Sequence, residues 1–346
     1  MSSASVGDDV DHVSAPPRPP PFLSPAEIDQ LCSQGYLDLD LSPLIMGQVE
    51  KLFEETSSFF MLPAETKARL FPSPAESSET GYSCIPDEKE FITLRFVSPP
   101  QGNSSEKEEA VRAGIETLVA RTWHDLAHLM HRILVDISVH LGHIMPSAWD
   151  PVIENTLGLP VSSEKATPAL MRIFRYEPEK GVADPHKDLG LLTICICDDK
   201  GLQVFDRSLA PAPGVSRDGN PDEDSLPDAE AESPSNHGSR NTRWRDAGRV
   251  TILTGDTLRI LSGNKINSGF HRVVATEKGR RSVVFAWRAS TDTLIDLADF
   301  GGTGVIASKA LWDRIKGSRV NINAQKHIRQ EQTERRRMKN AVQDIA

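Results

Sequence analysis

Residues 183–197, with the sequence Ala-Asp-Pro-His-Lys-Asp-Leu-Gly-Leu-Leu-Thr-Ile-Cys-Ile-Cys, combine two patterns within a short stretch. The second half, residues 191–197, is an almost continuous apolar and β-branched run, which is typical of a buried strand. The first half holds His186 and Asp188 at positions i and i+2. Side chains of a strand alternate between its two faces, so these two project from the same face. The stretch therefore predicts a β fold that carries two potential metal ligands side by side.

Further short strands are predicted on both sides of this stretch. Residues 170–176 alternate in polarity and contain aromatic side chains. Other runs with strand character are residues 249–253, 258–261 and 282–287, and turns between them are indicated by Gly255-Asp256 and Gly263-Asn264. Several short strands with turn signals between them favour an all-β sandwich or jelly roll.

A third potential ligand, His271, follows Asp188 after 83 residues. It lies between Ser268-Gly269 and a Val-Val pair, so it is expected to begin or end a strand. Two imidazoles and one carboxylate on one face of a metal leave open coordination positions. This arrangement suits a non-heme ferrous ion that handles dioxygen.

A second i, i+2 pair, Arg280 and Ser282, precedes the apolar run 283–287. On a strand the guanidinium and the hydroxyl share one face. Placing both inside an apolar barrel is unfavourable unless an anion pairs with them. A dicarboxylate cosubstrate would supply that anion.

These motifs occur in a fixed order along the chain: His186-x-Asp188, Gly201-Leu202-Gln203-Val204, Gly255-Asp256-Thr257-Leu258, Ser262-Gly263-Asn264, His271-Arg272-Val273 and Arg280-x-Ser282. Together they resemble the iron(II)- and 2-oxoglutarate-dependent dioxygenases of the isopenicillin N synthase-like group. The N-terminal third is similar to the leader region of that group in Phe59-Phe60-x-Leu62-Pro63-x-Glu65-x-Lys67, Gly81-Tyr82 and Glu88-Lys89-Glu90-Phe91. The resemblance spans roughly residues 24–295.

The resemblance implies a mainly β fold with a double-stranded β-helix (jelly-roll) core, a helical N-terminal region and a C-terminal helix. It implies that His186, Asp188 and His271 hold Fe(2+), and that Arg280, Ser282 and Tyr176 bind the distal carboxylate of 2-oxoglutarate. It also indicates that the region containing Tyr82, Phe91 and Arg95 lines the substrate pocket, together with Trp287. A surface salt bridge is the alternative role for Arg95.

The implied activity couples oxidative decarboxylation of 2-oxoglutarate by O2 to hydroxylation of a small organic molecule, which we expect to belong to specialised metabolism. Desaturation and cyclisation are alternative outcomes. Two other functions compete with this one. A non-catalytic binding protein would keep the scaffold and sense a ligand, and a zinc hydrolase would use the same three ligands without oxygen.

The domain organisation follows from composition. Residues 1–22 form a proline-rich tail that we expect to be disordered. Residues 23–165 form the leader region, with helices from Ser24, over 43–60 and over 106–143. Residues 166–295 form the catalytic core, and residues 296–346 a basic helical segment. Within the core, residues 206–243 carry eight acidic and four basic residues and few large apolar ones, so a disordered insertion is predicted there.

A rival metal site is the sequence His124-Asp125-Leu126-Ala127-His128, which has the spacing of zinc proteases with Asp in place of Glu. On the predicted helix 106–143 these histidines and His131 fall on the polar side, away from the apolar stripe. A solvated helix face is therefore the preferred interpretation.

Composition restricts the remaining possibilities. The chain has 346 residues, 38% of them hydrophobic, and a formal net charge of −10. This charge disfavours nucleic acid as a partner, and the ten Lys and Arg residues within 309–339 are assigned to a solvated helix. No apolar run is long enough to span a membrane, and the N-terminus has no signal-peptide pattern. Four cysteines fit a reducing compartment, so a cytoplasmic protein is expected. The sequence predicts no oligomeric state.

Overall fold

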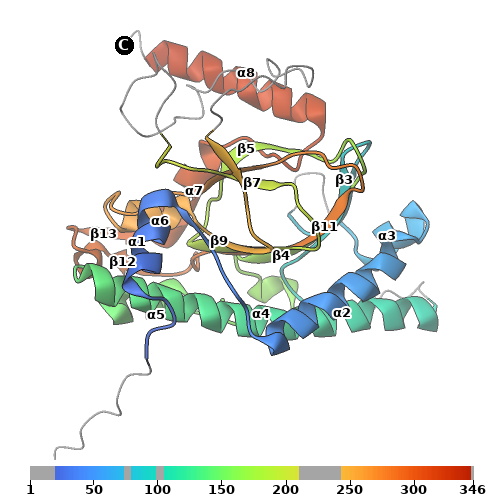
Figure 1. Cartoon of the computed structure of the whole chain (residues 1–346), viewed down its shortest axis with the longest axis horizontal. Coiled ribbons are helices and arrows are strands. Elements are labelled where there is room, and N and C mark those ends of the chain that lie inside the picture. Colours follow the sequence, from blue (N-terminus) through green and yellow to red (C-terminus); the bar gives the residue numbers. More distant parts are fainter. Residues whose placement is uncertain (1–19, 74–78, 99–104, 210–242, 344–346) are drawn as a thin grey trace, which may run out of the picture.

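The computed structural model describes residues 20–73, 79–98, 105–209 and 243–343, and their core is a pair of antiparallel sheets (Figure 1). The seven-stranded sheet has the order β1-β9-β6-β11-β4-β3-β2. Its strands are β1 (Tyr36–Asp38), β2 (Gly81–Ile85), β3 (Lys89–Leu94), β4 (Leu170–Tyr176), β6 (Leu192–Cys197), β9 (Val250–Thr254) and β11 (Arg280–Trp287). The four-stranded sheet, of order β5-β10-β7-β8, contains β5 (Ala183–Lys187), β7 (Leu202–Phe205), β8 (Trp244–Asp246) and β10 (Phe270–Val273).

Helices cover one face of the larger sheet. The helices are α1 (Pro25–Gln34), α2 (Pro43–Phe60), α3 (Ala64–Leu70), α4 (Glu106–Leu141), α5 (Trp149–Val152), α6 (Asp256–Leu261), α7 (Ser308–Gly317) and α8 (Lys326–Gln343). In Figure 1, α2 and α4 run side by side beneath the sheet, and Trp123 of α4 packs on Phe285 of β11 with ring centres 4.7 Å apart. Burial of these large apolar side chains fixes the sheet on the helices.

Local signals set the ends of the helices. Ser24 and Ser105 each form a capping box with the glutamate three residues later, which satisfies backbone N–H groups that the first helical turn leaves unpaired. Gly35 and Gly142 end α1 and α4 in the left-handed conformation. The predicted helices from Ser24, over 43–60 and over 106–143 are therefore confirmed.

The predicted strand over residues 258–261 is wrong, because these residues belong to α6. Leu258 and Leu261 are both buried, as expected for positions i and i+3 on one helix face. A run of four residues is too short to show this period. Gly255 precedes the helix and packs tightly against the backbone of Gly190, since a Cβ on Gly255 would lie 2.1 Å from the carbonyl oxygen of Gly190.

The predicted disordered segments 1–22 and 206–243 lie outside the described residues, except for residues 20–22, 206–209 and 243. Within the described part, the boundary at residue 206 needs correction. The backbone N–H of Arg207 donates to the side chain of Gln34 (2.7 Å), and Nη2 of Arg207 donates to the carbonyl of Ser268 (2.8 Å). Residues 206–209 are thus part of the ordered fold.

The C-terminal part begins with a hairpin of β12 (Leu294–Asp296) and β13 (Val305–Ala307), which the helical prediction for residues 296–346 missed. The predicted helical character appears in α7 and α8. Helix α8 lies on the side of the molecule where β5 and β7 are found, opposite α4 (Figure 1). Among the residues that the structure describes, no helix is both long and apolar enough to cross a membrane.

Candidate metal centre

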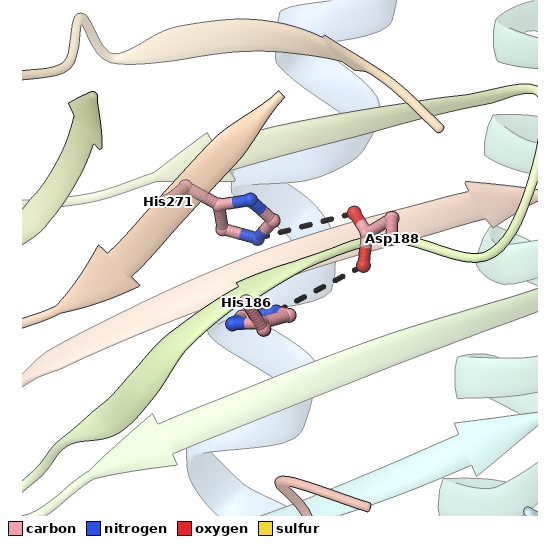
Figure 2. A group of neighbouring side chains, drawn as sticks. All are labelled: His186, Asp188 and His271. Atoms are coloured by element: carbon pink, nitrogen blue, oxygen red, sulfur yellow. Dashed lines mark ion pairs between the residues drawn. The ribbon is translucent and has the colours of Figure 1, made fainter. Parts of the chain in front are cut away.

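Three predicted ligands, His186, Asp188 and His271, converge in the structure (Figure 2). Strand β5 carries His186 and ends one residue before Asp188, and β10 carries His271. The antiparallel register of β5 and β10 places His186 directly opposite His271, with ring centres 4.1 Å apart. The Nε2 atoms of His186 and His271 each lie 3.9 Å from a different oxygen of Asp188. A pair of neighbouring strands therefore brings together ligands that lie 83 residues apart in the sequence.

The donor atoms suit a metal ion. Nδ1 of His186 lies 2.8 Å from the carbonyl oxygen of Asp184, and Nδ1 of His271 lies 3.2 Å from that of Gly269. Carbonyl oxygens only accept, so each Nδ1 carries the proton and each Nε2 presents a lone pair toward Asp188. Within the described chain, Oδ2 of Asp188 is buried without a hydrogen-bond partner. Two lone pairs that face a carboxylate are favourable only with a cation between them.

Electrostatics keeps the ligands in their metal-binding forms. Burial, together with the neighbouring His271, lowers the pKa of His186 to about 3, so its imidazole is neutral near pH 7. Burial opposes ionisation of Asp188, but the polar and positively charged groups around it outweigh burial, and the pKa of this carboxyl lies below its usual value. A neutral imidazole and an ionised carboxylate are the forms that bind a metal.

A cavity of about 420 Å³ opens at this triad, between the two sheets. This volume is typical of sites for small molecules. Its walls come from the seven-stranded sheet (Arg172, Phe174, Tyr176, Cys195, Arg280, Val284, Ala286), from the four-stranded sheet and its flanks (Ala183, His186, Lys187, Asp188, Leu189, Leu202, His271, Val273), and from Glu79, Arg288 and the C-terminal residues Lys316, Arg319, Val320, Asn321, Ile322, Asn323 and Gln332.

At one end of β11 the structure brings together Arg280, Ser282 and Tyr176. The register of β11 and β4 pairs Arg280 with Tyr176, and the guanidinium carbon lies 5.0 Å from the centre of the tyrosine ring. Nε and Nη1 of Arg280 and Oγ of Ser282 are buried, and none of them has a hydrogen-bond partner among the described residues. Burial raises the pKa of the Tyr176 phenol, which keeps its proton. Unpaired buried donors of this kind fit an anionic ligand.

None of the four predicted substrate contacts is among the residues that line the cavity, although the charge of Arg95 lies within electrostatic reach of Glu79, Arg172 and Arg288. Tyr82 donates to Glu90 (2.7 Å), and Nε of Arg95 donates to the carbonyl of Thr167 (3.0 Å). Phe91 lies beside Phe174 on the neighbouring strand β3, with ring centres 5.0 Å apart.

Trp287 faces away from the cavity because of strand alternation. Val284 and Ala286 of β11 line the cavity, so Trp287 projects from the opposite face, where it is buried and donates to Thr156 (3.0 Å).

Sequence reasoning missed two cavity arginines, Arg172 and Arg288. The period-two alternation of side chains along β4 and β11 could have indicated both arginines. Arg172 lies four residues before Tyr176 on β4 and therefore shares its face, and Arg288 continues the even-numbered series that begins at Arg280.

The rival histidines occupy the outside of α4. The side chain of His124 is 61% exposed and pairs with Asp125, and the ring of His128 lies 4.3 Å from that of His124. Of the residues described, only His186, Asp188 and His271 form a group with the spacing of a metal site.

The sequence and the fold are similar to those of known proteins, although no protein-family model matches the chain. Oxidoreductase vrtI of Penicillium aethiopicum is 31% identical over 148 residues, which are 40% of this chain and 29% of that protein. The 2-oxoglutarate-dependent dioxygenase frbH of Dothideomycetidae sp. (strain 11243) is 27% identical over 153 residues, which are 40% of this chain and 36% of that protein. The matches thus span about a third of the length of these curated relatives.

A crystal structure of a 2OG-Fe(II) oxygenase family protein from Caulobacter crescentus superposes with a TM-score of 0.58 and 18% identity, over 84% of this chain and 94% of that chain. At this identity the likeness concerns the fold. In sequence and in fold, the resemblance to the iron(II)- and 2-oxoglutarate-dependent dioxygenases that the motifs predicted is confirmed.

Proposed function

We propose that the chain is an iron(II)- and 2-oxoglutarate-dependent oxygenase that oxidises a small organic molecule inside a double-stranded β-helix. The observation that carries this proposal is the group of two imidazoles and one carboxylate at the wall of a cavity of about 420 Å³. The names of the relatives and the unpaired arginine and serine donors support it.

The three ligands would occupy one face of the ion and leave the face toward the cavity open. Asp188 supplies the negative charge, and the carbonyls of Asp184 and Gly269 orient the two imidazoles. When bound, iron(II) supplies the reduction of dioxygen that couples decarboxylation of 2-oxoglutarate to oxidation of the substrate.

The cosubstrate would be oriented by the other cluster. Arg280 is a buried cation with two unpaired donor atoms, and Ser282 adds a hydroxyl on the same strand face. These donors would hold the carboxylate of 2-oxoglutarate that lies away from the metal, with the Tyr176 phenol as a further donor. Phe174 and Val284 between the two clusters exclude water from the reacting atoms.

Hydroxylation is the default outcome of such a site, and desaturation or ring closure are variants that depend on how the substrate lies. The small cavity favours a small organic molecule, and we propose a role in specialised metabolism in the cytoplasm. No nucleic acid or membrane partner is part of this proposal.

Separate His186→Ala and His271→Ala variants test the proposal, with His124→Ala on the outer face of α4 as the matched control. Each ligand variant should weaken Fe(II) or Mn(II) binding by more than about 100-fold, because loss of a direct ligand exceeds the 10- to 100-fold effect of an outer partner. Binding is measured by anaerobic titration calorimetry, and succinate release by mass spectrometry across a metabolite panel.

The wild-type chain and His124→Ala should bind the metal and form succinate only with iron(II), 2-oxoglutarate and oxygen. Unchanged metal affinity in His186→Ala or His271→Ala would overturn the metal assignment. Normal metal binding with no succinate from any metabolite would instead favour a non-catalytic ligand-binding protein. Oxygen-independent hydrolysis with zinc would favour a hydrolase.

A further inference from the structure

A second charged cluster, formed by Glu79, Arg172 and Arg288, lines the cavity away from Arg280. Nη2 of Arg172 lies 3.3 Å from Oε1 of Glu79, and Nη1 of Arg288 lies 2.9 Å from Oε2. Arg172 also donates from Nε to the hydroxyl of Thr93 (3.1 Å). One carboxylate thus faces two guanidinium groups, and the cluster keeps one positive charge in excess.

Arg288 is held in a fixed position with donor capacity left over. It is 5% exposed, donates to the carbonyl of Pro168 (3.1 Å), and its guanidinium carbon lies 4.8 Å from the ring centre of Trp312. In the part of the chain that the structure describes, its Nε is buried and has no hydrogen-bond partner. A buried, incompletely paired guanidinium is unfavourable by itself and favours an anion nearby.

The whole cavity has an excess of cations. Apart from the histidines, its charged residues are six cations (Arg172, Lys187, Arg280, Arg288, Lys316, Arg319) and two anions (Glu79, Asp188), and Arg319 pairs with Asp256 outside this lining. In the proposed function, the two charges of iron(II) are balanced by those of 2-oxoglutarate. Arg172 and Arg288, which share the single carboxylate of Glu79, therefore retain a positive charge for another anion.

This cluster is separate from the proposed cosubstrate end. On β11 the cavity residues run from Arg280 through Val284 and Ala286, and Arg288 follows directly after the strand. Eight residues of extended chain separate the α-carbons of Arg280 and Arg288 by roughly 26 Å. The charge of Arg288 interacts with that of Asp188, so the cluster lies within electrostatic reach of the metal ligands.

We propose that Arg172 and Arg288 form the substrate subsite and that the substrate is an organic carboxylic acid bound as its anion. This inference rests on the proposed function, because it names the class of molecule that the oxygenase takes. The planar guanidinium groups match a carboxylate in shape and hydrogen bonding. The apolar side chains of Leu189, Val284 and Ala286 would contact the hydrocarbon body of the acid.

Glu79 acts as the counterion of the two arginines. Burial opposes its ionisation, yet Arg288 and Arg172 outweigh this effect and hold the pKa of its carboxyl well below the usual value. Glu79 therefore stays charged and reduces, without cancelling, the attraction for a second carboxylate. Removing this charge should strengthen binding of an acid, whereas removing either arginine charge should weaken it.

The test uses the full chain loaded with Mn(II) and 2-oxoglutarate, in which binding is measured without turnover. Phenylacetate, cinnamate and octanoate are titrated beside their methyl esters by calorimetry. The best-binding acid should bind at least about tenfold more tightly than its ester, which is the effect of one charge-assisted hydrogen bond. Arg172→Gln and Arg288→Gln should each weaken binding of that acid by about tenfold or more. Glu79→Gln should strengthen its binding.

Arg281→Gln is the matched control, since Arg281 pairs with Asp198 outside the cavity, and it should leave acid binding unchanged. Acids that bind no better than esters would overturn the subsite. Weaker binding in Glu79→Gln, together with the arginine variants, would also overturn it, because a purely structural ion pair predicts equal losses. If Arg288→Gln fails to fold, the other two variants test the subsite, because Arg172→Gln should weaken acid binding and Glu79→Gln should strengthen it. Mn(II) and 2-oxoglutarate binding on the same samples reports on the proposed function separately.

Discussion

Two consecutive arginines on β11 show how strand alternation assigns different roles to identical side chains. Arg281 points away from the cavity toward α2, where its Nε donates to Asp198 (2.7 Å) and its Nη1 donates to the carbonyl of Phe53 (2.8 Å). Arg280 points inward, is 6% exposed, and has buried donors without hydrogen bonds among the described residues. An inward cation without a carboxylate partner favours an anionic ligand over a structural ion pair.

Arg280→Ala should therefore weaken 2-oxoglutarate binding selectively. The expected loss is about 2–4 kcal/mol, as for removal of one member of a buried charge pair. Titration of 2-oxoglutarate into the Mn(II)-loaded protein measures it, and Mn(II) affinity should stay within about twofold, because Arg280 contacts no metal ligand that the structure describes. Arg281→Ala is the control and should leave both constants unchanged. Equal 2-oxoglutarate affinity in Arg280→Ala and Arg281→Ala would show that another group binds the cosubstrate.

At this scale the sequence predicted the members of the two polar clusters, His186, Asp188 and His271, and Arg280 and Ser282. Period-two alternation determines which residues share a face, and this can be read from spacing. The sequence did not predict Glu79 as a cavity residue, because its place depends on how the segment before β2 packs against Arg172 and Arg288. Trp287 lies five positions after Ser282 on β11, so strand alternation places it on the opposite face, and the period-two pattern does not support its prediction as a pocket residue.

At the scale of elements, the long helices were predictable from the sequence, whereas the short helix α6 and the β12–β13 hairpin were not. Helix α4 has 36 residues and a complete capping box, so many periods of burial identify it. Helix α6 has six residues, and its apolar positions fit a buried strand equally well. The residue before it, Gly255, packs against the backbone of Gly190, a contact between distant segments that no local pattern shows.

The C-terminal segment has a role that its composition did not indicate. Residues 319–323 and Gln332 line the cavity. Arg329 of α8 anchors this segment, since its Nη2 lies 2.5 Å from Glu88 and its Nη1 lies 3.5 Å from Asp184 on β5. A helix that looked solvated in the sequence therefore closes one side of the pocket through a buried arginine.

Arg329→Ala should release this segment while the core remains folded. Breaking a buried ion pair costs about 3–5 kcal/mol, and the effect should be confined to the weakly packed C-terminal part. Hydrogen exchange followed by mass spectrometry should show faster exchange across residues 319–335 and unchanged exchange in β4 and β11. The control is Arg335→Ala on the same helix, since that side chain is 82% exposed. Unchanged exchange in residues 319–335 of Arg329→Ala would mean that Arg329 does not hold the segment.

For the molecule as a whole, the arrangement of the two sheets explains how residues 210–242 can interrupt the core without separating the metal ligands. Strands β7 and β8 pair on either side of this segment, with Phe205 opposite Trp244. The backbone N–H of Asp206 donates to the carbonyl of Arg243 (2.7 Å), and Nε of Arg243 donates to the carbonyl of Leu209 (3.0 Å). The chain thus leaves and re-enters the sheet at one point, next to the strand that carries His271.

Replacing residues 211–241 with a four-residue Gly-Asn loop should therefore preserve both the fold and the metal centre. Each halving of loop length favours folding by about 0.6 kcal/mol, so the melting temperature should stay the same or rise slightly. Mn(II) affinity should remain within about twofold, because the hairpin bonds and the β7–β10 register are untouched. Differential scanning calorimetry and metal titration measure the two quantities.

The control deletion is longer by a few residues and removes 206–243 entirely. It eliminates the bonds from Arg207 to Gln34 and Ser268, which join the hairpin to α1 and to the loop before β10. This longer deletion should lower the melting temperature, since hydrogen bonds of a partly buried arginine contribute about 1.5–3 kcal/mol each. A drop of more than about 5 °C in the shorter deletion would correspond to more than about 1 kcal/mol. It would show that residues 211–241 stabilise the core, contrary to the prediction from their composition.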